Sequence, residues 1–244
     1  MLITRHADAE AVLSDPRYVP PPVRQDAEEG TLAWLRAQVS RFSAGETHAG
    51  RRRLLVERLA ALDPAELRPA ARAMTSERDG DWRGVPTAVL GAALGVKDTS
   101  AVPAAAAGYL SGEESPEADA AVAELLELAG IPEITLLLQG HAATEALIEN
   151  ALRQAHPGDD IETLLNETLK QDPPLKATRR LDTQTGEEVT IDLVAANRDP
   201  SGGRTPHLTF GYGVRPCPAP AHALALAAGV LEALLHGKPA RRPE

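Results

Sequence analysis

The sequence has one cysteine, few aromatic residues and no long apolar run. Because Cys217 is the only cysteine, no disulfide can form within the chain, and nothing in the composition predicts an oxidising compartment. No segment approaches the roughly 20 consecutive apolar residues that a membrane-spanning helix needs, and the first residues hold no apolar signal core. We therefore expect a cytoplasmic protein that does not enter a membrane.

The charges are unbalanced in a way that argues against nucleic acid as a partner. The 244 residues include 35 acidic and 25 basic side chains, which gives a formal net charge of −10. Neutralising the phosphates of a nucleic acid needs clustered lysine and arginine instead. Lysine is scarce and alanine abundant, a bias typical of a GC-rich bacterial genome. With 43% hydrophobic and 25% charged residues, the chain is expected to be soluble and globular.

Periodic apolar positions predict a mainly α fold with a small β-sheet. Only the segment 176–194 has a strand pattern, with a turn at 185–187. The segment 98–116 is small and rich in alanine, so we expect a loop or a poorly packed helix there. No linker or internal repeat is visible, which predicts a single domain over residues 1–244. The expected helices cover residues 7–13, 31–42, 47–62, 116–129, 132–154 and 160–170, one begins at Asp63-Pro64, and a last one runs from 218 to 235 and ends at Gly237.

The strongest chemical signal is the run Phe210-Gly211-Tyr212-Gly213-Val214-Arg215-Pro216-Cys217, directly before the last helix. Glycines let a backbone pass close to a flat ligand, and an arginine can pair with a carboxylate. A cysteine at a helix N-terminus is favoured as a thiolate by the helix dipole. A lone cysteine taken by itself is more often an inert buried side chain. The whole run, however, resembles the heme-binding loop of the cytochrome P450 family, and this resemblance makes Cys217 the expected ligand of a heme iron.

The resemblance to this family extends, in the correct order, from about residue 2 to about residue 235. His48 and Arg52 are four residues apart on one helix face, so both can reach the same anion. A basic stretch of this kind is also typical of an ordinary solvated helix face. Arg180, with Arg179 as a close second, matches a position that holds a heme propionate in the family. The resemblance thus implies heme b (iron protoporphyrin IX) bound by His48, Arg52, Arg180, Phe210, Gly211, Arg215, Cys217 and Ala219, where Ala219 replaces the family's glycine.

One conserved pairing of the family is altered in this sequence. Where the family has Glu-x-x-Arg on a helix, this chain has Glu167-Thr168-Leu169-Lys170, and lysine lacks the planar fork of arginine. The segment that supplies the second arginine of the pairing is largely absent, since only six residues separate Pro200 from His207. Arg204 is a candidate for that second arginine. The alternative is that Glu167 and Lys170 form an exposed helical pair that contributes little.

A second departure lies in the segment that resembles the oxygen-binding helix. Ala142 and Ala143 stand where the family has an acid and an alcohol that deliver protons, and neither alanine can donate or accept one. Gln139 and Ala143 are four residues apart and share a face, so we expect Gln139 to be a hydrogen-bonding residue on the distal side of the heme. Gln139 as an ordinary helix-surface residue is the alternative. His141 points almost the opposite way and is expected to be structural or exposed.

Taken together, the resemblance implies a truncated cytochrome P450-like fold and a heme-thiolate oxidoreductase that acts on a small organic molecule. The two distal alanines favour peroxide-driven oxidation, or a biosynthetic rearrangement or bond formation, over ordinary coupled monooxygenation. The family's substrate lid is shortened here, so we expect a redox partner or a second subunit to cover an open distal side. The alternative is a non-catalytic relative of the family, either a heme-binding protein or an auxiliary scaffold.

Overall fold

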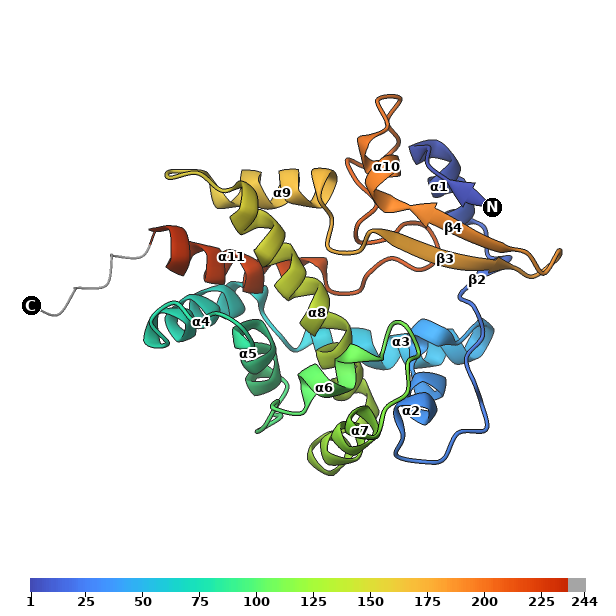
Figure 1. Ribbon diagram of the computed structural model, residues 1–244, viewed down its shortest axis with the longest axis horizontal. Helices are drawn as coiled ribbons and strands as arrows, with labels where there is room; N and C mark the ends of the chain where they lie inside the picture. The colour runs from blue at the N-terminus through green and yellow to red at the C-terminus, as the bar shows by residue number, and fades with distance from the viewer. Residues whose placement is uncertain (237–244) are drawn as a thin grey trace, which may run out of the picture.

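The computed structural model describes residues 1–236, which form a helical body with a small sheet beside it (Figure 1). The longest helix, α8 (Ile131–Gln154), runs through the centre of the molecule (Figure 1). Beside one half of it lie α4 (Pro64–Glu77), α5 (Val85–Ala93) and α11 (Pro220–His236). The predicted mainly α architecture with a small sheet is confirmed.

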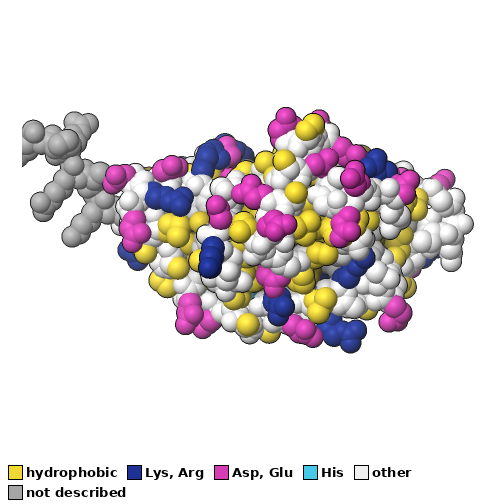
Figure 2. Space-filling view, turned by 90° about the horizontal axis from the view of Figure 1, so that it is seen from below, with side chains coloured by type: hydrophobic (Ala, Val, Ile, Leu, Met, Phe, Trp, Pro, Cys, Tyr) yellow, Lys and Arg dark blue, Asp and Glu magenta, His cyan; other side chains and the backbone are white. Residues whose placement is uncertain are grey.

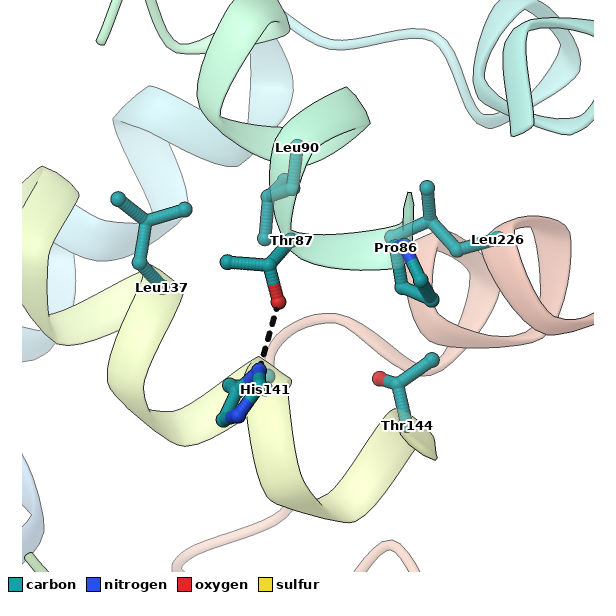
Figure 3. A pocket seen from close by; sticks show the side chains of 8 residues that line it. Pro86, Thr87, Leu90, Leu137, His141, Thr144 and Leu226 are labelled. Atoms are coloured by element: carbon teal, nitrogen blue, oxygen red, sulfur yellow. Dashed lines mark hydrogen bonds between the residues drawn. The ribbon is translucent and has the colours of Figure 1, made fainter. Parts of the chain in front are cut away.

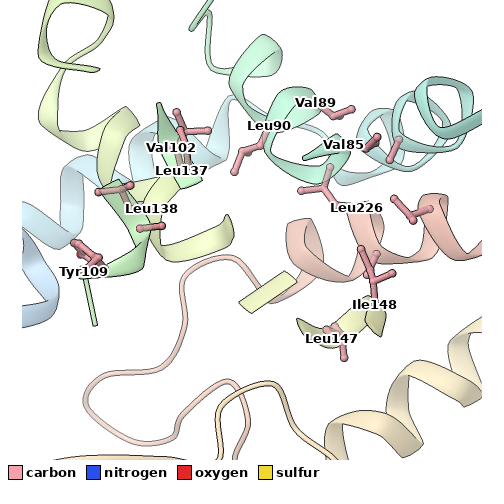
Figure 4. Close-up of a cluster of buried hydrophobic side chains, with 14 of the residues drawn as sticks. Val85, Val89, Leu90, Val102, Tyr109, Leu137, Leu138, Leu147, Ile148 and Leu226 are labelled. Atoms are coloured by element: carbon pink, nitrogen blue, oxygen red, sulfur yellow. The ribbon is translucent and has the colours of Figure 1, made fainter. Parts of the chain in front are cut away.

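One apolar core joins these four helices. Val85, Leu137, Ile148 and Leu226 come from three of them and gather in a buried cluster (Figure 4). The backbones of α4 and α11 approach so closely that a Cβ on Gly229 would lie 2.1 Å from the carbonyl oxygen of Arg68. Only glycine allows this approach. The bundle therefore fixes α11, and with it the cysteine loop that precedes α11.

The sheet has four strands in the order β1-β4-β3-β2. β3 (Ala177–Asp182) and β4 (Glu188–Asp192) form the hairpin that the sequence predicts between residues 176 and 194. β1 (Leu2–Ile3) adds to β4 in parallel, and β2 (Tyr18–Val19) adds to β3 antiparallel. Because successive strand residues point to opposite faces, Arg179 and Arg180 of β3 are directed differently.

Two helices pack against the sheet and form a second, smaller apolar core with it. These are α1 (His6–Ser14) and α10 (Leu193–Arg198), and they bury Leu13, Ile191 and Leu208 together. Leu208 belongs to the segment that leads into the cysteine loop. This segment is thus packed against the sheet region on one side and against the helical body on the other.

The remaining helices lie around α8. α2 (Leu32–Gln38) is followed by the 3₁₀ turn η1 (Ser40–Phe42) and by α3 (Gly45–Ala60). α6 (Val102–Ala107) and α7 (Pro116–Leu128) pack at the end of α8 away from α9 (Ile161–Gln171) (Figure 1).

Most of the predicted helices are confirmed, with two kinds of difference. The predicted helix 31–42 is interrupted at Val39, where the backbone is extended between α2 and η1. The segment 98–116, expected as a loop or a poorly packed helix, contains α6, in which Val102 and Ala105 are fully buried. Small alanine side chains allow this helix to pack closely, although they give no periodic signal. The predicted end of the last helix at Gly237 lies outside the described residues.

Within residues 1–236, no helix combines the length and the apolar character that crossing a membrane would require.

Candidate functional site

The cysteine loop runs between α10 and α11 and depends on two glycines with left-handed backbones. Gly211 has φ +74° and Gly213 has φ +64°. A Cβ on Gly213 would lie 2.5 Å from the Leu13 carbonyl oxygen, and the next residue, Val214, donates its N–H to that oxygen at 3.2 Å. The sequence suggested that such glycines approach a flat ligand. For Gly213 the neighbour is instead the end of α1, so this glycine anchors the loop to the sheet region.

Cys217 is partly buried and held by two backbone hydrogen bonds. Its N–H donates to the Phe210 carbonyl oxygen at 2.6 Å, which closes the loop. Its sulfur accepts the N–H of Ala219 at 3.4 Å, while Pro218 and Pro220 on either side of Ala219 have no N–H to offer. Burial raises the pKa of the Cys217 thiol, and the Ala219 N–H and the charge of Arg52 only partly oppose this rise. Burial is thus the largest influence on this thiol, ahead of the hydrogen bond and the nearby positive charges.

α3 brings two of the predicted propionate residues to the cysteine loop. Arg52 donates to the carbonyl oxygen of Pro216, the residue before Cys217. His48 Nδ1 lies 2.9 Å from the Ser40 carbonyl oxygen and 3.3 Å from Nη1 of Arg215. One ring nitrogen cannot both donate to the carbonyl and accept from the guanidinium. We assign the proton to Nδ1, because the contact with the carbonyl is the shorter one.

Arg215 and Arg180 complete this group of basic residues. Arg215 donates to the Ser43 carbonyl oxygen at 2.7 Å. Arg180 turns inward from β3 and donates at 2.8 Å to the Thr178 hydroxyl and at 2.8 Å to the Arg179 carbonyl oxygen. Arg179 is exposed instead and pairs with Glu188 at 3.4 Å. Of the two candidates in the sequence, Arg180 is therefore the one that faces the loop region.

Among residues 1–236, no carboxylate neutralises this group. None of Arg52, Arg180 and Arg215 forms an ion pair with an acidic side chain in the described part of the chain. Burial lowers the pKa of Arg180 to about 10, and the positive charges of Arg41 and Arg215 add to this effect. A guanidinium stays protonated in proteins, so the lowered pKa expresses the unfavourable environment of a half-buried cation that has no counter-ion among the described residues.

The group fits a ligand with two carboxylates beside a metal. His48, Arg52 and Arg180 lie around the loop of Cys217, which itself contributes Arg215, and anionic groups would supply the missing counter-charge. Among residues 1–236 no cluster of three or more His, Cys, Asp or Glu could hold a metal ion. A heme would need only one protein ligand for its iron, which Cys217 could provide. Its two propionates would supply the carboxylates that the basic group lacks. Arg41, which lies within electrostatic reach of Arg180 and Cys217, was not identified from the sequence.

On α8, Gln139 and His141 lie on different faces. The Gln139 side chain donates to the hydroxyl of Tyr109 at 3.1 Å, and Tyr109 is fully buried. Burial raises the pKa of Tyr109 to about 12, so its hydroxyl stays neutral. His141 instead lies against α5, where its Nδ1 is 2.8 Å from the Thr87 hydroxyl (Figure 3). Ala143 shares the Gln139 side of the helix and is half-buried, whereas Ala142 is exposed.

Two cavities lie away from Cys217 and the basic group around it. One of about 10 Å³ sits between α5, α8 and α11, beside His141 and Thr144 (Figure 3), and has room for about one water molecule. The other, of about 300 Å³, lies between α4, α9 and α11. Its one cation, Arg68, is already paired with Glu162 and Glu232. Neither cavity is lined by Cys217 or by the basic group around it.

Near the altered Glu-x-x-Arg segment, a buried asparagine joins α9 to the segment that leads into the cysteine loop. Glu167 and Lys170 are exposed and form no ion pair among the described residues. Arg204 is joined through its backbone N–H to Glu10, 2.8 Å away, and not to Glu167. Asn197, only 2% exposed, donates to the Leu169 carbonyl oxygen of α9 at 3.1 Å.

The same asparagine also holds the start of the loop. Its side-chain oxygen accepts the Leu208 N–H at 2.7 Å, and its nitrogen donates to the Thr209 hydroxyl at 3.0 Å. That hydroxyl donates to the Leu169 carbonyl oxygen at 2.6 Å. The end of α9 and the segment before Phe210 are thereby joined through buried hydrogen bonds.

Several solved structures are similar to this chain in fold. P450BioI, solved in complex with an acyl carrier protein ligated to hexadec-9Z-enoic acid, matches with a TM-score of 0.75 and 19% identity, over 98% of this chain and 85% of that chain. The myxobacterial cytochrome P450 CYP267B1, solved with myristic acid, matches with a TM-score of 0.74 and 19% identity, over 98% and 82% of the two chains. For CYP164A2 of Mycobacterium smegmatis the TM-score is 0.70 at 21% identity, over 96% and 83%.

No protein-family model matches the sequence. No curated protein matches it significantly either. The matches to solved structures nevertheless extend over nearly the whole chain. This chain has the cytochrome P450 fold in a shortened form.

Proposed function

We propose that this protein is a heme-thiolate enzyme that acts on a small organic molecule. The observation that carries the proposal is Arg180, a guanidinium turned inward beside Arg41 and Arg215 that pairs with no carboxylate of the described residues. An uncompensated buried charge is unfavourable, and a bound anion removes that cost. Heme b carries two propionates, and Cys217 lies next to the same basic group, so the residues present fit this cofactor.

Each residue of the site has a separate part in this proposal. Cys217 ligates the iron, and His48, Arg52, Arg180 and Arg215 hold the propionates through charge-assisted hydrogen bonds. Phe210 and Gly211 shape the loop, and Ala219 donates its N–H to the sulfur. When bound, the heme supplies oxidative chemistry at its iron.

The residues of α8 favour reactions that do not need proton delivery from this helix. Ala142 and Ala143 have no group that holds or passes a proton. Gln139 can donate and accept hydrogen bonds, but its amide does not titrate. Thr144 is buried and lines the small cavity toward Leu226 (Figure 3). We therefore infer peroxide-driven oxidation, or a rearrangement or bond-forming reaction, rather than coupled monooxygenation.

We expect another protein to cover the distal side of the heme site. α6 has only six residues in the region that corresponds to the family's lid. One neighbour in fold, P450BioI, was solved with an acyl carrier protein. By analogy we propose that a carrier, a redox partner or a second subunit covers the site here. The alanine-rich and lysine-poor composition supports a bacterial source. We further propose a cytoplasmic location and a role in biosynthesis.

The second candidate is a non-catalytic relative, either a heme sensor or carrier or an auxiliary scaffold that retains the fold. The observation that favours it is the loss of both proton-delivering side chains at Ala142 and Ala143. Retention of Cys217 and of the basic group favours a bound heme over a scaffold without heme, because such a scaffold has no use for these residues.

The two candidates differ in what the purified protein does with an oxidant after loading with hemin. We expect turnover of a probe such as myristic acid with hydrogen peroxide, and mostly unproductive reductant consumption with a surrogate ferredoxin and its reductase. The double variant A142D/A143T should raise the coupled fraction with the surrogate partners. Coupled oxygenation by the unaltered protein would contradict the role given to the alanines. Heme binding without turnover by either route, on a panel of small acids and alcohols, would favour the non-catalytic relative.

A further inference from the structure

The turn η1 carries a basic residue that is held next to the propionate-binding group but is not part of it. His48 Nδ1 lies 2.9 Å from the carbonyl oxygen of Ser40, which begins the turn. Arg215 donates at 2.7 Å to the carbonyl oxygen of Ser43, which follows the turn. These two contacts attach both ends of the turn to the residues around Cys217. Arg41, inside the turn, therefore stands at the edge of the proposed heme site.

Arg41 has no counter-charge in the described part of the chain. Its guanidinium forms no hydrogen bond or ion pair there, and its aromatic neighbour is the Phe42 ring, whose centroid is 5.9 Å away. A heme would bring two propionate charges, whereas Arg52, Arg180 and Arg215 already provide three positive charges. On the face shown in Figure 2, acidic side chains are spread among basic and apolar ones. A further cation in the same place leaves a local excess of positive charge that a second anion would balance.

A series of contacts leads from Arg41 to the distal face of α8. The Phe42 ring packs against the Tyr109 ring with 5.6 Å between their centroids. The Tyr109 hydroxyl accepts the Gln139 amide at 3.1 Å. Arg36 lies on the same aromatic pair, with its guanidinium 4.5 Å from the Phe42 ring and its Nε donating to the Tyr109 carbonyl oxygen at 2.9 Å. Arg41 and Gln139 thus lie at the two ends of one packed group of side chains.

We infer that the substrate is an organic anion whose carboxylate or phosphate group binds to Arg41, with its uncharged part directed toward Gln139. This inference rests on the proposed function, because it assumes a heme beside Cys217. Guanidinium groups bind carboxylates and phosphates through paired hydrogen bonds, and aromatic neighbours such as Phe42 keep the planar group oriented. Gln139 and Tyr109 supply neutral polar contacts for the part of the substrate nearest the iron.

The experiment uses ligands that report their own binding through the heme spectrum. Imidazoles with an alkyl tail bind an iron through nitrogen and shift its absorption, whatever the tail carries. We would titrate the heme-loaded protein with three series of matched tail lengths, ending in a methyl group, a carboxylate or a phosphonate. The variants are Arg41→Met and, as the control, Arg53→Met, which removes an exposed arginine of α3.

For at least one tail length we expect an acid to bind the unaltered protein about tenfold more tightly than the methyl-ended ligand, as one charge-assisted contact predicts. The preference should fall to within about twofold in Arg41→Met, persist in Arg53→Met, and weaken as salt is added. The carboxylate and phosphonate series show which acid the site takes. Equal binding of all three series, or a preference that survives in Arg41→Met, would overturn the inference and leave the heme proposal standing.

Two other outcomes are also decisive. Loss of heme in Arg41→Met as large as in Arg180→Met would place Arg41 on a propionate and overturn its assignment to the substrate. A protein that takes up no heme at all would instead overturn the proposed function, and the inference with it.

Discussion

The side-chain oxygen of Asn197 accepts the backbone N–H of Leu208 at 2.7 Å and so joins α10 to the segment that enters the cysteine loop. Through its nitrogen, the same side chain reaches Leu169 at the end of α9. Both ends of this connection are buried, so water cannot replace it. Among the described residues, a neutral amide therefore joins α9 to the segment before Cys217, and Glu167 and Lys170 take no part in this connection.

Replacing Asn197 by alanine should therefore be costly. The change leaves the Leu208 N–H and the Leu169 carbonyl group buried with fewer partners, and we expect a loss of about 1–3 kcal/mol in the free energy of unfolding. Urea unfolding of the variant measures this loss. The matched control is Lys170→Ala, which removes an exposed side chain and should change stability by no more than about 0.5 kcal/mol. Equal effects of the two substitutions would refute the role given to Asn197.

Gly213 provides a test of how the loop is anchored. Gly213→Ala places a methyl group 2.5 Å from the Leu13 carbonyl oxygen and forces a left-handed backbone on alanine. The backbone conformation alone costs about 1–2 kcal/mol, so we expect a larger total loss on thermal or urea unfolding. Gly50→Ala, in the middle of α3 with open space around it, should instead stabilise the protein by up to about 1 kcal/mol. A neutral Gly213→Ala variant would show that the loop does not pack on α1 as described.

Replacing Arg180 should raise the stability of the heme-free protein and at the same time weaken its retention of heme. Arg180→Met removes an inward-facing cation without a counter-ion, so the heme-free protein should become more stable. The same change removes a propionate contact worth about 1.5–3 kcal/mol, so heme should dissociate roughly tenfold to a hundredfold more readily. Transfer of heme to apomyoglobin measures the second effect, and thermal unfolding of the heme-free protein measures the first.

The control for this pair of measurements is Arg179→Met. Arg179 is exposed and paired with Glu188, so its loss should alter neither heme retention nor stability by much. If Arg179→Met released heme as readily as Arg180→Met, the assignment between the two neighbouring arginines would be wrong.

The features that the sequence could predict are those fixed by local pattern. Amphipathic helices such as α8 and α9, the β3–β4 hairpin and the loop ending in Cys217 all depend on residues close together in the chain. α5 escaped notice because it is short and mostly buried, so it shows no polar face. α6 was expected to pack poorly because alanines give no periodic signal, yet their size is what lets it pack closely.

The features that could not be predicted depend on contacts between distant parts of the chain. Which of Arg179 and Arg180 faces inward follows from the pairing of β3 with its neighbours, not from the two residues themselves. Gly213 packs against α1, about 200 residues earlier in the chain. The motif therefore identified a glycine that matters, but its close neighbour is α1 and not the flat ligand that the motif suggested. Arg41 and Tyr109 meet across the Phe42 ring, and no local spacing indicates such a contact.

The central claim is that Cys217 ligates a heme iron, and one spectrum tests it most directly. The protein loaded with hemin is reduced, exposed to carbon monoxide and compared with Cys217→Ala treated in the same way. We predict a thiolate-type Soret band for the unaltered protein, and for Cys217→Ala either little bound heme or a band of the nitrogen- or water-ligated type. A protein that binds no heme, or a Cys217→Ala variant with an unchanged band, would contradict the account.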